Sequence, residues 1–156
     1  MDGQTFSLPP APSTYTVLLD TGTTLSYIPE DQFAVLLAAL NATGQTEAVE
    51  ANDGTVIYEV PCALALAEGG IDFEFSGPAG NLAIQVPWAE LVLPIPDANN
   101  FCPFGVTTDT QADTRGVYIL GDTFIRSAYL LYNFDASTIS LAQASYDPSP
   151  GQVIEI

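Results

Sequence analysis

Basic side chains are almost absent from this sequence. It contains no histidine and no lysine, and only Arg115 and Arg126 oppose 19 acidic residues. Without histidine the chain cannot build a serine-type or cysteine-type catalytic triad of its own, and it lacks the commonest metal ligand, so we expect no metal site. The net charge of −17 repels phosphate backbones and anionic lipids, which argues against nucleic-acid partners. Cationic peptides are better partners, and an acidic environment would relieve the self-repulsion.

Cysteine is also scarce, with Cys62 and Cys102 the only two. They lie too far apart for a CxxC redox motif, and two thiols without histidine are a poor zinc site. We therefore favour a disulfide, which would close a loop of about 40 residues and stabilise the fold by roughly 3 to 4 kcal/mol in the chain-entropy model, less any native strain. The sequon at Asn41 makes this residue a glycosylation candidate, although so short a motif also occurs by chance. Together these features indicate an oxidising, exported location: secreted, at the cell surface, or in the secretory pathway or vacuole.

Segments that would direct the chain to a membrane, or anchor it there, are not visible in the sequence. Met1 is followed by Asp2-Gly3-Gln4 instead of a basic and then apolar run, and no apolar segment is long enough to span a bilayer. Residues 148–156 hold no anchoring stretch, which favours free secretion if the native chain ends there. We therefore expect any export signal to lie in a longer precursor.

The composition predicts a globular, turn-rich β domain. At 156 residues one domain is expected, and 47% hydrophobic residues with 12 glycines and 12 prolines fit such a domain better than a disordered chain. Alternation at 71–75 predicts a strand with Asp72 and Glu74 at the surface. The other predicted elements are strand 17–19, a helix beginning at Pro29 and running to 40, a hairpin of 48–49 with 56–58 turning at 52–54, a strand after Pro61-Cys62, strands 82–86, 91–93 and 117–120, a helix over 123–127, and a closing hairpin of 128–134 with 137–142.

One stretch places a charge at the end of an apolar run. Val17-Leu18-Leu19 predict a strand buried on both faces, and Asp20 follows it directly. A carboxylate at such a position must be hydrogen-bonded or paired, because burying it unpaired costs many kcal/mol. Gly22 lets the backbone turn sharply and bring an amide close to the carboxylate. Nearby hydroxyls come from Thr21, Thr23 and Thr24. Taken alone, the Asp-Thr-Gly tripeptide is more typical of an ordinary turn than of a catalytic site, so the decision depends on its context.

The context resembles a known family. The segments LLDTGTTLSYIP and YILGDTFIRSAYLLYNFD, with the cysteine pair between them, resemble in order and spacing the C-terminal lobe of pepsin-like aspartic proteases. DTGTTL and ISLAQASY look most like the secreted or surface-anchored fungal branch, the yapsin-like and candidapepsin-like enzymes. The resemblance implies an all-β fold, mainly antiparallel with short helices. Residues 1–156 would form a single lobe, truncated at its N-terminal side. It also implies the pairing of Cys62 with Cys102.

In that family, two aspartates activate a water between them. Like charges a few ångströms apart cannot both ionise, so the pair shares a proton. The resemblance assigns one of these catalytic aspartates to Asp20. It assigns Thr21 to a hydrogen-bonded clasp between the two catalytic loops, and Thr23 to a hydrogen bond with the outer oxygen of Asp20. Gly22 would support the turn. It implies no metal and no other cofactor.

A second acid, Asp122, follows the predicted strand 117–120 and Gly121. The resemblance implies that this apolar-apolar-Gly step passes beside the catalytic loop in a ψ-shaped motif. Asp122 would then cap the helix over 123–127 instead of doing chemistry. Thr24 and Ile119 are the candidates for lining the substrate cleft.

We therefore expect an aspartic-type endopeptidase that hydrolyses peptide bonds at acidic pH, to which this chain contributes Asp20. The partners are a polypeptide substrate and the N-terminal lobe of the same protease, and the isolated chain is expected to be inactive. Two alternatives stay open. The chain could be a homodimeric protease with a dyad of two Asp20 residues, or a non-catalytic binding or inhibitor module. A second Asp-Thr/Ser-Gly upstream would favour the two-lobed enzyme.

Overall fold

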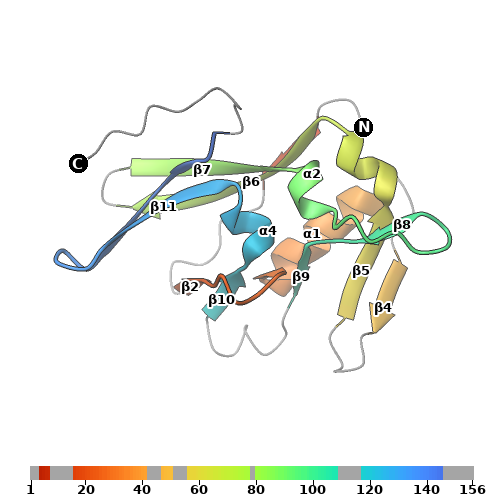
Figure 1. Ribbon diagram of the computed structural model, residues 1–156, viewed down its shortest axis with the longest axis horizontal. Helices are drawn as coiled ribbons and strands as arrows, with labels where there is room; N and C mark the ends of the chain where they lie inside the picture. The colour runs from red at the N-terminus through yellow and green to blue at the C-terminus, as the bar shows by residue number, and fades with distance from the viewer. Residues whose placement is uncertain are drawn as a thin grey trace.

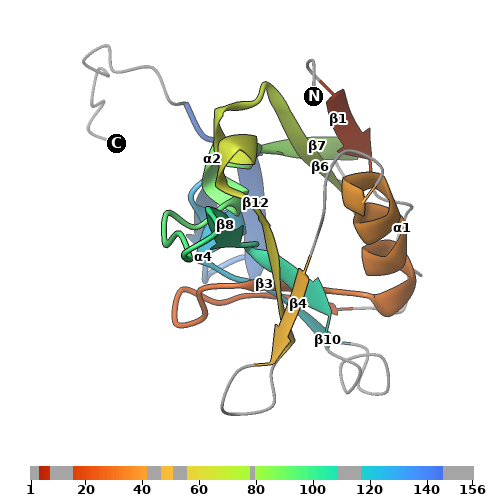
Figure 2. The same cartoon turned by 90° about the vertical axis from the view of Figure 1, so that its right-hand side faces the viewer.

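The computed structural model describes residues 4–7, 16–41, 47–50, 56–77, 80–108 and 117–145. This part of the protein is mainly β with short helices, which confirms the predicted fold class (Figures 1 and 2). The elements are β1 Gln4–Ser7, β2 Thr16–Leu19, β3 Ser26–Ile28, α1 Glu30–Asn41, β4 Glu47–Glu50, β5 Val56–Pro61, the 3₁₀ helix η1 Cys62–Leu66, β6 Gly69–Gly77, β7 Gly80–Pro87, α2 Trp88–Leu91, β8 Phe101–Pro103, β9 Val106–Thr108, β10 Val117–Leu120, α4 Asp122–Ile125, β11 Ala128–Asn133 and β12 Thr138–Gln143.

A four-stranded sheet with the order β2-β10-β3-β9 carries the loop that contains Asp20. Strand β10 lies between β2, to which it is parallel, and β3, to which it is antiparallel. The loop from β2 to β3 must therefore pass around the end of β10. Strands distant in sequence are brought together here, since Ile119 pairs with Leu18 on one side and Tyr27 on the other. This topology confirms the ψ-shaped motif implied by the resemblance.

The long hairpin of β6 and β7 forms a second sheet, with β1 parallel to β6 at its edge. Ile71 and Phe73 are buried whereas Glu74 is exposed, which confirms the predicted alternation. Opposite them on β7, Ile84 and Val86 are fully buried. One face of this hairpin therefore covers the core, and the other meets solvent, as is common for antiparallel sheets.

Large aromatic side chains fill the centre of the core. Trp88, Phe104 and Phe124 are fully buried, and they come from α2, the β8–β9 connection and α4. The ring centroids of Phe73 and Phe124 lie 5.2 Å apart in an edge-on arrangement, which aromatic pairs favour. Burying such side chains contributes about 1.5–3 kcal/mol each. The core therefore fixes α4, the helix that directly follows β10.

Helix α1 closes the other side of the core. Phe33, Leu36 and Leu40 recur at helical spacing and are buried, and Glu30 and Asp31 occupy the first turn, where their charge suits the helix dipole. The backbone amide of Phe33 donates to the carbonyl of Pro29 at 2.8 Å. This confirms the helix predicted from Pro29 to residue 40.

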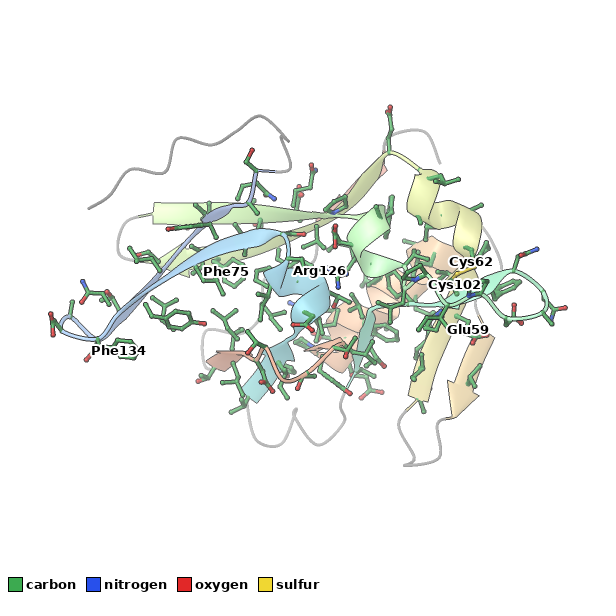
Figure 3. The ribbon with its side chains drawn as sticks, viewed as in Figure 1. Glu59, Cys62, Phe75, Cys102, Arg126 and Phe134 are labelled. Atoms are coloured by element: carbon green, nitrogen blue, oxygen red, sulfur yellow. A yellow bond between two sulfur atoms is a disulfide. The ribbon has the colours of Figure 1, made fainter. Side chains whose placement is uncertain are left out.

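The disulfide is present. Cys62 in η1 and Cys102 in β8 are bonded, with their Cα atoms 5.0 Å apart (Figure 3). Cys102 faces Val60 in the antiparallel pairing of β8 with β5. The link confirms the predicted pairing. It closes a loop that contains β6, β7 and α2.

Two predicted strands were wrong. The strand after Cys62 is the 3₁₀ helix η1, and the predicted strand 91–93 is replaced by the end of α2, with a single bridge from Val92 to Phe104. Short apolar runs have no periodicity long enough to separate strand from helix. The closing hairpin of β11 and β12 is confirmed, but it forms a separate two-stranded ladder instead of closing a larger sheet.

The hairpin of β4 and β5 is also confirmed, with Ala48 opposite Tyr58. Its predicted turn at 52–54 lies outside the described residues.

The strand before Asp20 was expected to be buried on both faces, and this too was wrong. Val17 is 42% exposed and Leu18 is 49% exposed. The reason is topological, because β2 stands at the edge of its sheet with β10 as its one described neighbour. A continuous apolar run predicts that a strand is buried, but it does not identify the segment or domain that buries it.

Candidate functional site

The carboxylate of Asp20 is held by donors from its own loop. The backbone amide of Gly22 donates to Oδ1 at 2.9 Å, and the hydroxyl of Thr23 donates to Oδ2 at 2.6 Å. The amide of Asp20 donates to the carbonyl of Leu120 at 3.1 Å, which continues the pairing of β2 with β10. Both carboxylate oxygens therefore have a fixed donor, and the backbone beneath them is tied to the sheet.

Gly22 leaves room for this geometry. A Cβ atom at this position would lie 3.2 Å from Oδ1 of Asp20, closer than side chains normally approach. Without a side chain, the amide of Gly22 reaches the carboxylate unobstructed. The structure thus agrees with the expectation that this residue brings an amide to the acid.

These hydrogen bonds favour the ionised acid. The Thr23 hydroxyl first, and the Gly22 amide second, lower the pKa of Asp20 below its ordinary value, while partial burial acts weakly in the opposite direction. Asp20 is only partly buried, and Thr21, Gly22 and Thr24 around it are exposed. The site is therefore an oriented, ionised carboxylate that solvent can reach, which is the form that can accept a proton from water.

A second segment, residues 121–123, clamps the loop from behind. A Cβ atom on Gly121 would lie 2.3 Å from the carbonyl oxygens of both Thr23 and Leu25. Next to this contact, the amide of Asp122 donates to the carbonyl of Thr23 at 2.9 Å, and the amide of Thr123 donates to that of Thr24 at 3.2 Å. The loop that presents Thr23 to Asp20 is thus fixed by close packing and by backbone hydrogen bonds.

The role expected for Asp122 was wrong. Helix α4 spans Asp122–Ile125 instead of 123–127, its N-cap is Gly121, and no side chain caps it. The reason lies in the clamp, because loop carbonyls already accept the first free amides of the helix and leave no donor for a side-chain cap. Asp122 is therefore the first residue of α4.

Two further polar residues behind the loop were not singled out from the sequence. Ser26 and Thr123 are fully buried and their hydroxyl oxygens lie 3.1 Å apart. A weak signal exists, since Ser26 opens an apolar strand and Thr123 precedes apolar residues, so each places a hydroxyl where hydrocarbon is expected.

The two cleft candidates lie on different elements of the site. Thr24 belongs to the Asp20 loop and is exposed. Ile119 lies in β10 and is partly exposed, whereas its neighbours Tyr118 and Leu120 are buried, so its side chain points to the opposite face of the sheet. Whether these two residues contact a substrate stays a prediction.

The remaining predictions concern regions away from this loop. Asn41 is the last residue of α1, and its sequon continues into residues that the structure does not describe, so glycosylation stays a prediction. Within the described ranges, no three potential metal-binding side chains cluster. Of the helices described, none has the length and apolar character to cross a membrane.

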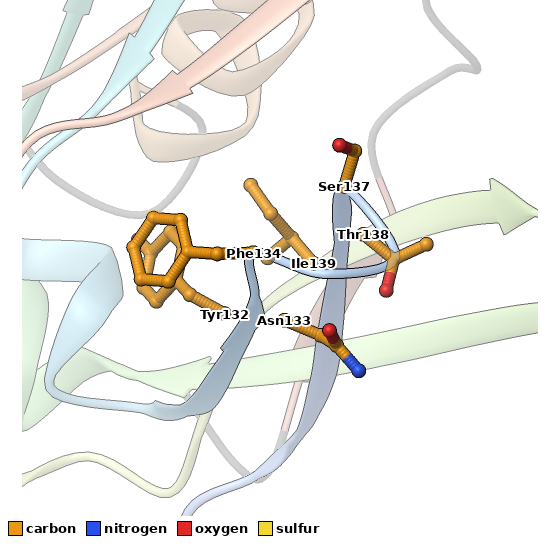
Figure 4. Close-up of a pocket in the computed structure, with 6 residues that line it drawn as sticks. All are labelled: Tyr132, Asn133, Phe134, Ser137, Thr138 and Ile139. Carbon is orange, nitrogen blue, oxygen red and sulfur yellow. The ribbon is translucent and has the colours of Figure 1, made fainter.

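A shallow apolar pocket lies at the tip of the β11–β12 hairpin (Figure 4). Its volume is about 230 Å³, and it shares no residue with the Asp20 loop. The lining residues are Tyr132, Asn133, Phe134, Ser137, Thr138 and Ile139. Its lining contains no acidic or basic side chain and no thiol.

Comparison with known proteins gives one consistent result. The family model described as eukaryotic aspartyl protease matches residues 2–144. Secreted aspartic protease 9 of Candida albicans is 37% identical over 134 residues, covering 86% of this chain and 22% of that protein. Secreted aspartic protease 8 of the same organism is 39% identical over 134 residues, covering 86% and 28%. Candidapepsin-3, also from this yeast, is 37% identical over 138 residues, covering 83% and 30%. The chain thus matches under a third of the length of these relatives.

Proposed function

Because the chain belongs to the eukaryotic aspartyl protease family, we propose that residues 1–156 are the C-terminal lobe of an aspartic endopeptidase and that Asp20 is one of its two catalytic carboxylates. The observation that carries this proposal is the fixed, ionised carboxylate of Asp20, whose two oxygens accept hydrogen bonds from Gly22 and Thr23. The resemblance assigned the same hydroxyl contact to Thr23.

The proposed chemistry is general acid–base hydrolysis. Asp20, kept ionised by its donors, takes a proton from a water molecule while the oxygen of that water forms a bond to the scissile carbonyl carbon. The partner carboxyl, which holds the shared proton, gives it to the carbonyl oxygen. The carbon–nitrogen bond then breaks as the leaving amine receives from Asp20 the proton taken from water, and a hydroxyl of the tetrahedral intermediate returns its proton to the partner carboxylate. Neither a metal nor a covalent intermediate is required.

We propose that the second carboxylate comes from an N-terminal lobe. Asp20 is the one acid in the sequence that precedes Thr-Gly or Ser-Gly, and the relatives are more than three times as long as the part matched here. The exposed Val17 and Leu18 in β2, the strand that leads to Asp20, support a protein cover over this edge of the sheet. The substrate would be a polypeptide. A secreted location is proposed because these relatives carry that description in their names.

The decisive experiment replaces Asp20 in the complete protein. Asp20→Asn should abolish hydrolysis of a peptide substrate at acidic pH and leave thermal unfolding little changed, because the amide keeps the size of the acid but cannot share the proton. Asp122→Asn is the matched control. Its acid caps nothing in the structure, so substantial activity should remain. An active Asp20→Asn protein beside a folded but inactive Asp122→Asn protein would show that the wrong aspartate was chosen.

A further inference from the structure

Two buried hydroxyls form a hydrogen-bonded chain behind the Asp20 loop. Thr123 Oγ1 donates to the carbonyl of Gly105 at 2.8 Å and lies 3.1 Å from Ser26 Oγ, which accepts from the amide of Gly121 at 3.3 Å. Each hydroxyl has one proton. Since Thr123 uses its proton on Gly105, Ser26 must donate to Thr123. Each hydrogen bond is therefore donated in the same direction, from the amide of Gly121 through Ser26 and Thr123 to the carbonyl of Gly105.

Both ends of this chain are attached to parts of the molecule that matter for the site. The carbonyl of Gly105 also accepts from the amide of Ser26 at 2.9 Å, and the amide of Gly105 donates to the carbonyl of Leu91, which is fully buried in the core. At the other end stands Gly121, which packs against the carbonyls of Thr23 and Leu25. The two hydrogen-bonded hydroxyls thus connect the buried core to Gly121, the residue that packs against the catalytic loop.

We infer that Ser26 and Thr123 are positioning residues, whose hydrogen-bonded hydroxyls hold Gly121 against the loop and so keep Thr23 on the carboxylate of Asp20. This inference rests on the proposed function, in which Asp20 is catalytic. Neither residue can act on a substrate directly, because both side chains are fully buried. Their effect must pass through the loop that they support.

Thr123 allows the hydroxyl to be tested separately from packing. Its methyl group fills the space that a Cβ atom on Gly105 would occupy, at 2.4 Å from that position, whereas its hydroxyl donates to the carbonyl of Gly105, so the two groups make different kinds of contact. Thr123→Val keeps the methyl group and removes the hydroxyl, whereas Thr123→Ser does the reverse. Thr138→Val, on the exposed β12 strand, is the matched control for the chemical change itself.

The variants are compared in the complete protein by steady-state peptide hydrolysis and thermal unfolding. Thr123→Val removes both hydrogen bonds of this hydroxyl. It should lower kcat about tenfold, equivalent to about 1.4 kcal/mol of transition-state stabilisation, with KM within about twofold. Thr123→Ser should recover most of the lost kcat while its unfolding temperature falls. Ser26→Ala should lower kcat by as much as Thr123→Val does. If Thr123→Val fails to fold, Ser26→Ala tests the positioning role in its place. Thr138→Val should behave as the unaltered protein.

The results separate this inference from the proposed function. If Asp20→Asn is inactive but a folded Thr123→Val or Ser26→Ala protein keeps its full kcat, the positioning role is wrong and the catalytic role of Asp20 stands. If Thr123→Val and Thr123→Ser lose kcat in proportion to their loss of stability, the hydroxyl has no special role and the inference is likewise overturned. If Asp20→Asn is active, both fail together.

Discussion

The contact between Gly121 and the Asp20 loop can be tested with a single methyl group. In Gly121→Ala, the new Cβ atom would lie 2.3 Å from the carbonyl oxygens of Thr23 and Leu25. Both are backbone atoms, so no side-chain rotation can relieve the overlap. Either the loop or the end of β10 must move by about 1 Å to restore an ordinary van der Waals separation.

The structure gives a scale for the effect. Overpacking a closely packed site costs about 1–3 kcal/mol, and the backbone character of the contact places Gly121→Ala at the upper end of that range. The movement also separates Thr23 from the carboxylate of Asp20, since the clamp holds Thr23 directly. A misplacement of about 1 Å in catalytic geometry can cost about a hundredfold in rate. We therefore expect a loss of activity larger than the loss of stability alone would produce.

The assay is peptide hydrolysis at acidic pH together with denaturant unfolding of the complete protein. Gly77→Ala is the matched control, because a Cβ atom there would meet its nearest neighbour, the carbonyl of Gly80, at 3.9 Å. This change should alter stability by no more than about 0.5 kcal/mol. If Gly121→Ala unfolds and hydrolyses peptide as the control does, the clamp around Asp20 does not exist as described.

Three further predictions follow from the same structure. Replacing Cys62 and Cys102 by serine should lower the free energy of unfolding by roughly 3 to 4 kcal/mol, and reduction should add two hydrogen atoms to the mass of the native protein; freely alkylated thiols before reduction would contradict this. The 156-residue chain alone should hydrolyse peptides negligibly, and cleavage that rises with its dimer fraction would instead support the homodimer. Thr23→Ala should raise the pKa of Asp20 towards its ordinary value. The ionised acid stabilises the folded protein, and this stabilisation is lost as pH falls through the pKa of Asp20 in the folded protein, so in the variant it should be lost at a higher pH. An unchanged NMR titration of Asp20 would refute this prediction.

The local chemistry of the site could be predicted from the sequence because it is encoded over a few adjacent residues. An acid after an apolar strand, a glycine two positions later and a threonine three positions later place donors within reach of one carboxylate, and Asp20, Gly22 and Thr23 have this geometry. The hairpin and core of β6 follow equally from a clear alternation. Such short-range patterns carry their own geometry.

Contacts between distant segments could not be predicted in the same way. The chain of hydroxyls joins Ser26 to Thr123, 97 residues apart, and no pattern within either segment identifies its partner. The helix start at Asp122 was misjudged for a related reason, because the acceptors for its first amides are carbonyls of the Asp20 loop and not a local side chain. The exposure of β2 depended on sheet order, which the strand itself does not encode.

The contribution of each lobe to the proposed active site follows from which lobe supplies the hydrogen-bond donors to Asp20. Its carboxylate is oriented by Gly22 and Thr23, and its backbone is held by Leu120, all within this chain. The other lobe would therefore not need to orient Asp20, but would have to supply a second carboxylate and cover Val17 and Leu18. Bringing two ionised carboxylates together is unfavourable, and a net charge of −17 adds general repulsion. Acidic pH protonates carboxylates and so lowers both the repulsion within the catalytic pair and the repulsion from the net charge. The pH at which the pair holds its shared proton is therefore also the pH that favours the compact, assembled enzyme.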